Sequence, residues 1–244
     1  MDKIFSALSP EIPEVFKNIP VKRSSRRKHI AVKMRPDGSC ELLIPLRTSE
    51  IQLQKALEHF APWIAQQQKK LSSQPENLRP CEFAFSIGGN FYYCGQAYEL
   101  KLLQANGSQI ISFRDNALWS ASSDPAAIQK MMENFYRRQT RRLVTGLLEK
   151  YAEKFNISYG EISINGARRR FGSCNSKGDL NFSWLLAMYP VDLIELVVLH
   201  ELSHRSEMNH SARFYKVLSN YLPDHRERDR KLKLWSSKLS LYPA

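Results

Sequence analysis

The segment VVLHELSHRSEMNH, residues 197–210, constrains the fold and chemistry of this chain more than any other stretch. It contains the pattern HExxH, formed by His200, Glu201 and His204. Residues four apart lie on one face of an α-helix, so both imidazoles can bind one metal ion from the same side. Glu201 lies about 100° further round the helix, where its carboxylate can reach a metal-bound water. The segment therefore predicts a helix that presents a metal site and a general base.

This pattern is typical of a catalytic zinc site. A single Zn²⁺ ion lowers the pKa of a bound water towards about 7. Glu201 can take the proton of that water as it attacks a carbonyl carbon, which predicts a zinc metallopeptidase acting on a peptide or protein substrate. The same chemistry also suits a metal-dependent hydrolase of a non-peptide amide or ester.

The position of the third metal ligand depends on where the motif helix ends. His210 follows His204 by six residues, and an unbroken helix would carry it about 9 Å beyond His204. We therefore expect the helix to end near residues 208–209, with Asn209 in a left-handed conformation. A second helix then begins with Asn209 or Ser211 as its cap. The alternatives that stay open are Glu207, on the same helical face, and the downstream residues Asp224, His225 and Glu227.

The chain is basic, with a net charge of +12. Residues 22–35, KRSSRRKHIAVKMR, hold seven Lys and Arg and no acid, and further clusters lie at 137–142 and 168–170. A well-solvated surface accounts for such clusters, and so does attraction to a polyanion such as nucleic acid. Composition does not choose between them. The candidate nucleic-acid contacts are Arg23, Arg26, Arg27 and Lys28.

Several features favour a cytoplasmic protein. No apolar run approaches the roughly 20 residues that span a bilayer, so we expect no membrane segment. The first residues lack the basic and apolar regions of a secretory signal. The four cysteines are scattered and form no CxxC pair, which argues against a disulfide framework or a cysteine-rich zinc site. The oligomeric state is not indicated.

The sequence pattern predicts an irregular lead-in over residues 1–21. It predicts that residues 22–123 form a β-rich N-terminal region with one long helix. Alternating apolar residues around PDGS predict a hairpin at 29–45. A three-to-four-residue period predicts a helix over 48–71, capped by Thr48 or Ser49. Its expected buried residues are Ile51, Leu53, Ala56, Leu57, Phe60 and Ile64. After a linker-like stretch at 72–80, short strand signals predict a small antiparallel sheet.

Residues 124–244 are predicted to form the catalytic domain that holds the HExxH motif. Asp124 as a cap and Pro125 at the first helical position begin a long helix. Two strand-like stretches follow at 161–167 and 178–186, and the motif helix comes after them. The fold class predicted for the whole chain is therefore α+β.

Five segments of this half occur in a characteristic order with short spacings. They are RRRFGSC (168–174), LNFSWLLAMYP (180–190), VVLHELSH (197–204), MNHSARFY (208–215) and LPDHRERDRKLK (222–233). Together they resemble the YgjP-like metallopeptidase family, which comprises predicted metal-dependent hydrolases related to SprT-like zincins. The N-terminal segment RSSRRKHIAVKMRPDGSCELLIPLRTSE is similar to that family's usual opening, so the resemblance covers roughly residues 21–238. Residues 72–125 match only loosely, and Phe171 stands where the family usually has Trp.

The resemblance implies a zincin-type fold in which the motif helix packs under a small sheet. It implies that His200, His204 and His210 bind zinc, with Glu201 as the base. SprT-like relatives suggest, as an alternative, a nucleic-acid-associated protease that uses the basic N-terminal segment as its arm. In zincins the substrate strand pairs with the sheet edge above the metal, and by that analogy residues 179–186 are the candidate edge strand.

The basic loop before this strand carries the remaining candidate contacts. Arg170, Gly172, Ser173 and Asn175 are expected to form a flexible rim of the cleft. Arg170 can face a developing oxyanion or a substrate carboxylate, and Asn181 is a second candidate for such a contact. The same loop can equally hold a turn against the motif helix.

Overall fold

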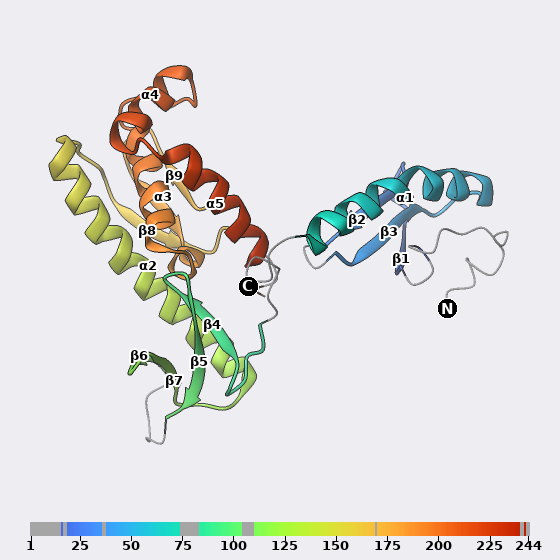
Figure 1. Cartoon of the computed structure of the whole chain (residues 1–244), viewed down its shortest axis with the longest axis horizontal. Coiled ribbons are helices and arrows are strands. Elements are labelled where there is room, and N and C mark those ends of the chain that lie inside the picture. The colour runs from blue at the N-terminus through green and yellow to red at the C-terminus, as the bar shows by residue number, and fades with distance from the viewer. Residues whose placement is uncertain are drawn as a thin grey trace. The chain divides into compact units, whose positions relative to one another are not determined.

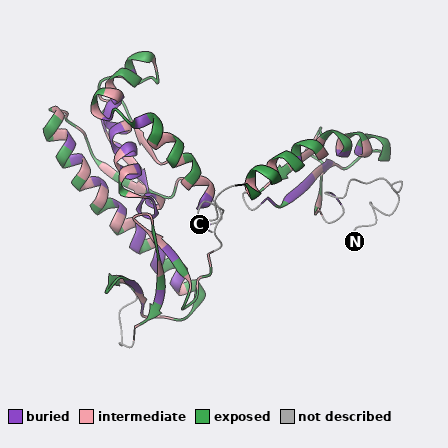
Figure 2. Ribbon diagram, viewed as in Figure 1, coloured by how far each residue is buried: buried purple, intermediate pink, exposed green. Residues whose placement is uncertain are grey.

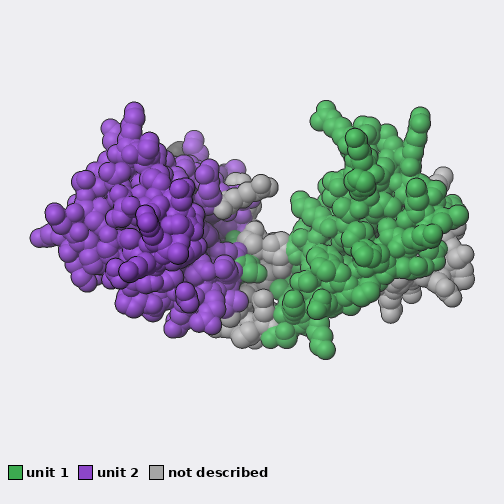
Figure 3. Space-filling model, turned by 90° about the horizontal axis from the view of Figure 1, so that it is seen from above, with its two compact units in different colours: residues 1–81, 237–241 green, residues 82–236, 242–244 purple. Residues whose placement is uncertain are grey.

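The structure is a computed structural model that describes residues 16, 19–35, 38–73, 83–103, 110–168, 170–239 and 242. Within these residues the chain has five α-helices and three small sheets, which confirms the α+β class. Its contacts divide it into two units, residues 1–81 with 237–241 and residues 82–236 with 242–244 (Figures 1 and 3). This division lies after residue 81 rather than at the predicted 123/124, because residues 83–103 and 110–123 pack with the motif region.

The first unit is a three-stranded sheet with one helix. Its strands lie in the order β1-β3-β2, with β1 parallel and β2 antiparallel to β3. The predicted hairpin is the β2–β3 pair, whose turn residues 36–37 lie outside the described residues. The elements are β1 (Val21–Ser24), β2 (Ala31–Met34), β3 (Cys40–Pro45) and α1 (Glu50–Ser72).

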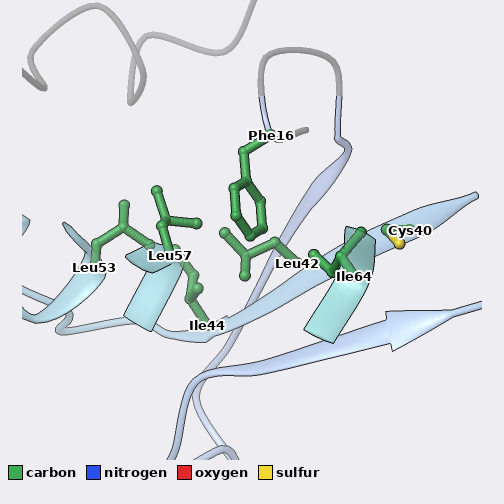
Figure 4. Close-up of a cluster of buried hydrophobic side chains, with 7 residues drawn as sticks. All are labelled: Phe16, Cys40, Leu42, Ile44, Leu53, Leu57 and Ile64. Carbon is green, nitrogen blue, oxygen red and sulfur yellow. The ribbon is translucent and has the colours of Figure 1, made fainter. Parts of the chain in front are cut away.

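Local chemistry explains why α1 begins where it does. The Ser49 side chain accepts a hydrogen bond from the backbone N–H of Gln52, and the Gln52 side chain accepts one from Ser49 in return. The helix then packs on the central strand β3, the most buried strand of this unit (Figure 2). The core they form is shown in Figure 4 and consists of Phe16, Cys40, Leu42, Ile44, Leu53, Leu57 and Ile64.

One predicted core position of α1 is wrong. Ile51 is 70% exposed, whereas Leu53 and Leu57 are buried. Ile51 and Leu53 are two positions apart, which is about 200° round a helix, so they cannot share one face. The apolar stripe therefore begins at Leu53.

The second unit begins with a four-stranded sheet whose order is β4-β5-β7-β6. The prediction of an antiparallel sheet is wrong for one pair, because β5 and β7 run parallel. Asp115 and Asn116 have positive φ and close β6 and β7 into a tight hairpin that places β7, rather than β6, beside β5. The strands are β4 (Asn90–Tyr93), β5 (Gln96–Leu102), β6 (Ile111–Arg114) and β7 (Ala117–Ser120).

Helix α2 (Pro125–Phe155) connects this sheet to the motif region. It begins as predicted, with the Asp124 side chain accepting a hydrogen bond from the Ala127 backbone N–H. Near its middle, the Tyr136 hydroxyl donates to the carbonyl of Tyr92 in β4 at 2.8 Å. One turn later the Thr140 hydroxyl donates to the carbonyl of Trp184 at 2.9 Å. These contacts join α2 both to β4 and to Trp184, which precedes the motif helix.

The sheet beside the motif has the order β8-β10-β9. Strand β10 (Leu180–Ser183) lies in the centre, parallel to β8 (Ile162–Asn165) and antiparallel to β9 (Gly172–Cys174). The prediction that residues 179–186 form the edge strand is therefore wrong, and β9 lies at the edge. Strand β9 has three residues and no apolar alternation, so a basic loop was the natural interpretation of its sequence.

Three helices complete the second unit. They are α3 (Val191–Ser203), α4 (Ala212–Tyr221) and α5 (His225–Lys238). Nine of the thirteen residues of α3 are buried, as expected for a helix covered on several sides. None of the helices in the described ranges is both long enough and apolar enough to cross a membrane.

Candidate metal centre

Helix α3 ends at Ser203, earlier than predicted, with His204 as its cap residue. The prediction that Asn209 adopts a left-handed conformation is wrong, since it is absent from the described residues with positive φ. The turn is closed instead by backbone hydrogen bonds from Ser206 and Glu207 to the carbonyl of Ser203, both 3.1 Å. The chain therefore turns back directly after the motif, and the next helix begins with Ser211 as its cap, one of the two predicted caps.

This turn brings the three histidines together. The Nε2 atoms of His200 and His210 are 2.9 Å apart, and one ligand atom from each of His200, His204 and His210 lies within 4.8 Å of the others. Nδ1 of His204 donates to the carbonyl of Glu207 at 3.1 Å, which leaves its Nε2 as the ligand atom. Zinc–nitrogen bonds of about 2.0–2.1 Å place ligand atoms about 3.4 Å apart in a tetrahedron. The donor set therefore fits one metal ion.

None of the alternative third ligands belongs to the metal-binding group of the described residues. Glu207 provides its backbone carbonyl to His204, and its carboxylate is not part of the metal-binding group among the described residues. The Asp224 carboxylate pairs with Arg228 at 2.8 Å. Glu227 and His225 also have other partners, Lys231 and Ser219 respectively.

Phe214 is a part of this centre that the sequence did not reveal. It is fully buried on α4, and its ring centroid lies 4.6–4.8 Å from those of His200, His204 and His210. The cap at Ser211 fixes the start of α4 and so brings Phe214 under the three imidazoles. The run MNHSARFY was the available signal, because a serine cap before an apolar residue predicts such a packed first turn.

Burial sets the protonation of the site. It lowers the pKa of His200 to about 4, with the neighbouring His204 and His210 adding to the effect, and it lowers the pKa of His204. Both imidazoles are therefore neutral near pH 7, which is the form that binds metal. Burial also raises the pKa of Glu201 to about 8, opposed in part by Arg170.

Glycine at position 172 makes room for Glu201. A Cβ atom at Gly172 would lie 2.5 Å from Oε1 of Glu201, closer than van der Waals contact allows. The backbone of edge strand β9 therefore lies directly against the carboxylate of the motif. Gly172 lines the cleft as the sequence predicts, and its packing against Glu201 is a tertiary contact that no sequence pattern indicates.

The histidines and Glu201 share a cleft of about 670 Å³. Its walls come from α3, edge strand β9, the turn before α4, and the faces of α4 and α5. Arg170 lines the cleft, as predicted for a rim residue. Asn181 does not line it; its side-chain oxygen accepts a hydrogen bond from the hydroxyl of Ser163 on β8.

Strand β9 is an edge strand, and within the described part of the chain no strand pairs with its outer side. Asn175 donates to Asp179 at 3.1 Å, and Ser183 donates to Phe171 at 2.8 Å. In an antiparallel pair, backbone groups alternate between facing the partner strand and facing away. The N–H and C=O groups of residues 172 and 174 are therefore directed away from β10, towards the open edge.

The candidate nucleic-acid contacts lie in the other unit. Arg23 is on β1, and Arg26, Arg27 and Lys28 occupy the turn that follows it. Nothing in these positions tests their predicted role.

Residues 28–234 match the model of the YgjP-like, metallopeptidase domain family. The chain belongs to this family. The resemblance seen in its motifs is thereby confirmed.

Two individual proteins are similar to it. The UTP pyrophosphatase of Escherichia coli (strain K12) is 22% identical over 129 residues, which cover 52% of this chain and 71% of that protein. The crystal structure of the metallopeptidase zymogen jannalysin of Methanocaldococcus jannaschii is 22% identical, with a TM-score of 0.31, and the match covers 38% of this chain and 92% of that one.

Proposed function

We propose that this protein is a zinc-dependent metallopeptidase with a zincin-type active site. The observation that carries the proposal is the convergence of His200, His204, His210 and Glu201 on one cleft beside a free strand edge. Three histidines form the ligand set of an open, catalytic zinc site.

Glu201 has the position and environment of a general base. His200, His204 and His210 would hold a zinc ion, and that ion would supply a polarised water for attack on a carbonyl carbon. Glu201 accepts a proton in this step and can return it to the leaving amine. The raised pKa of Glu201 means that its carboxylate holds this proton well. The positive charge of Arg170 limits how far the pKa of Glu201 is raised. Arg170 is also available to a negatively charged group of the substrate.

The edge of β9 supports a peptide as the substrate. An extended peptide can pair with the outward backbone groups of residues 172 and 174 and add a strand to the β8-β10-β9 sheet. That pairing would carry a peptide bond past Glu201, because Gly172 packs against this carboxylate.

The Glu201→Gln variant tests the proposal. We expect it to bind about one zinc per chain, as the wild type does, and to lose at least a hundredfold in peptide hydrolysis. Glu207→Gln is the matched control, since the Glu207 carboxylate is not in the metal-binding group. Hydrolysis of a denatured protein or a peptide library, with zinc measured by mass spectrometry, gives the answer. Full activity in Glu201→Gln would refute the role of this residue.

A second candidate is the hydrolysis of a nucleoside triphosphate. It is favoured by the similarity to a protein named UTP pyrophosphatase and by two arginines, Arg170 and Arg226, that line the cleft. Arginine is well suited to phosphate. Incubating the metal-loaded protein with UTP, and separately with peptides, distinguishes the two substrates. Release of pyrophosphate without peptide cleavage would replace the first proposal with the second.

A further inference from the structure

His225 is a fourth histidine of the cleft, and it is separate from the three histidines of the metal-binding group. It is the first residue of α5, is only 5% exposed, and lines the cleft together with His200 and Glu201. It does not belong to the metal-binding group of the described residues. The role of its side chain is therefore open.

The hydrogen bonds around His225 fix which of its nitrogens carries the proton. The Ser219 hydroxyl donates its single proton to the carbonyl of Tyr215 at 2.7 Å. The 3.0 Å contact between Ser219 Oγ and His225 Nε2 must therefore be donated by Nε2–H. In the neutral ring Nδ1 consequently carries a lone pair and can only accept.

Nδ1 of His225 is free to meet a ligand. Among the described residues it has no hydrogen-bond partner, although the side chain is more than nine-tenths buried. It is also not sealed inside the protein, because the only fully buried, unpartnered side-chain N or O atom of those residues is the Tyr242 hydroxyl. Nδ1 therefore keeps some accessible surface, and His225 is one of the residues that line the cleft.

The surroundings keep the ring neutral and oriented. Burial lowers the pKa of His225, the Arg226 guanidinium lowers it further, and Asp229 and Asp224 oppose them. The ring stacks on Tyr215, with centroids 6.1 Å apart and planes 22° apart. The stacking contact and the Ser219 hydrogen bond together fix the orientation of the ring and therefore the direction in which Nδ1 points.

We propose that Nδ1 of His225 binds the substrate by accepting a hydrogen bond from one of its N–H groups. This inference rests on the proposed peptidase function. Glu201 lies against β9, whereas His225 lines the same cleft from α5. In an extended peptide, successive N–H groups point to opposite sides. A peptide paired with β9 on one side thus presents its other N–H groups away from β9, and an acceptor on another wall of the cleft can bind them.

Binding to a hydrolysis-deficient protein tests the proposal directly. In the zinc-loaded Glu201→Gln background, His225→Gln retains a donor for Ser219 but lacks an acceptor at the Nδ1 position, whereas His225→Asn places an oxygen near that position. We expect His225→Gln to weaken binding of a fluorescent probe peptide about tenfold, and His225→Asn to recover most of it. His29→Gln, at an exposed histidine, is the control.

The outcomes separate this proposal from the proposed function. Unchanged peptide affinity in His225→Gln, or no binding of any probe peptide, would overturn the role of His225. Loss of zinc in His225→Gln would overturn it too and make His225 a ligand. Peptide hydrolysis by the wild type decides the proposed function independently. Long-range ¹H–¹⁵N NMR of the histidines gives a further check, because a ring protonated at Nδ1 would contradict the inference.

Discussion

At the scale of single residues, the chemistry of the centre depends on close packing around the motif. The sequence pattern correctly brought together His200, His204 and Glu201, because four-residue spacing on a helix is a local property. Phe214 under the imidazoles and Gly172 against Glu201 come from other elements. Tertiary contacts of this kind leave no spacing rule in the sequence, so they could not be predicted.

Gly172→Ala should disable the site without removing the metal. The new Cβ would lie 2.5 Å from Oε1 of Glu201 and force either this carboxylate or β9 to move. We expect activity to fall at least tenfold, because a displacement of about 1 Å in an active site has effects of this size. Zinc content should stay near that of the wild type.

Gly146→Ala is the matched control for this change. Gly146 lies within α2, and a Cβ there meets no atom within 4 Å. Alanine should raise the free energy of unfolding by up to about 1 kcal/mol and leave activity unchanged. Equal activity of Gly172→Ala and Gly146→Ala would show that Glu201 tolerates displacement.

The identity of the third ligand is decided by comparing two alanine variants. His210→Ala removes a nitrogen that lies 2.9 Å from Nε2 of His200, so zinc affinity should fall by at least a hundredfold. Glu207→Ala retains the backbone carbonyl that orients His204, and its affinity should change little. Competition with a chelator measures both. The reverse order of affinities would transfer the ligand role to Glu207.

At the scale of elements, capping signals in the sequence predict where helices start. The sequence does not predict which strands pair with each other. Ser49, Asp124 and Ser211 cap helices as the sequence indicated, because capping is a contact between near neighbours. The end of α3 was predicted too late, since its turn is closed by the Ser203 carbonyl and by the His204 side chain. The parallel β5–β7 pair and the edge position of β9 depend on contacts across many residues.

A partly buried ion pair fastens α5 to α3. Arg228 donates to Glu195 at 2.5 Å and to the carbonyl of Asp192 at 2.9 Å, and the Tyr151 hydroxyl also donates to Glu195. Glu195→Gln should lower the free energy of unfolding at pH 7 by about 2 kcal/mol, since hydrogen bonds to a charged group are involved. Asp224→Asn, at the exposed partner of Arg228, should cost less than about 1 kcal/mol.

The effect of Glu195→Gln should depend on pH in one direction. Burial alone would raise the pKa of Glu195, but hydrogen bonds from Tyr151 and Arg228 outweigh it and lower the pKa. The stabilisation is therefore fully present above the pKa of an unfolded glutamate, about 4.3, and is lost as the pH falls through the lower folded value. Urea unfolding should show the two proteins converging below about pH 4. A constant difference down to pH 2 would contradict this assignment.

At the scale of the whole molecule, the two units carry different candidate binding sites. The second unit holds the metal centre and its cleft. The first unit has its own small core and carries the basic run of residues 22–35. Glu41 is the acid of its central strand, and it pairs with Lys22 at 2.6 Å. Lys22 lowers its pKa most, through a hydrogen bond that outweighs burial, and the charges of Arg35 and Lys33 add to this.

This excess of positive charge leads to a prediction about nucleic acid. If the first unit binds a polyanion, its affinity for single-stranded or duplex DNA should fall steeply as the salt concentration rises. On duplex DNA, each phosphate that the protein neutralises adds about 0.9 to the slope of log K against log salt concentration. Replacing Arg26, Arg27 and Lys28 by alanine should reduce that slope by about 2 to 3. Fluorescence anisotropy with labelled oligonucleotides at several salt concentrations measures it.

The matched control replaces three lysines of α1, Lys55, Lys69 and Lys70, which removes the same charge from the helix of the same unit. An equal loss of slope in both triple variants would mean that net charge alone attracts DNA. A loss confined to the first variant would place the contact at the turn after β1, because local phosphate contacts rather than overall charge then set the counterion release. No binding at low salt would leave the basic run as a solvated surface and restrict function to the metal centre.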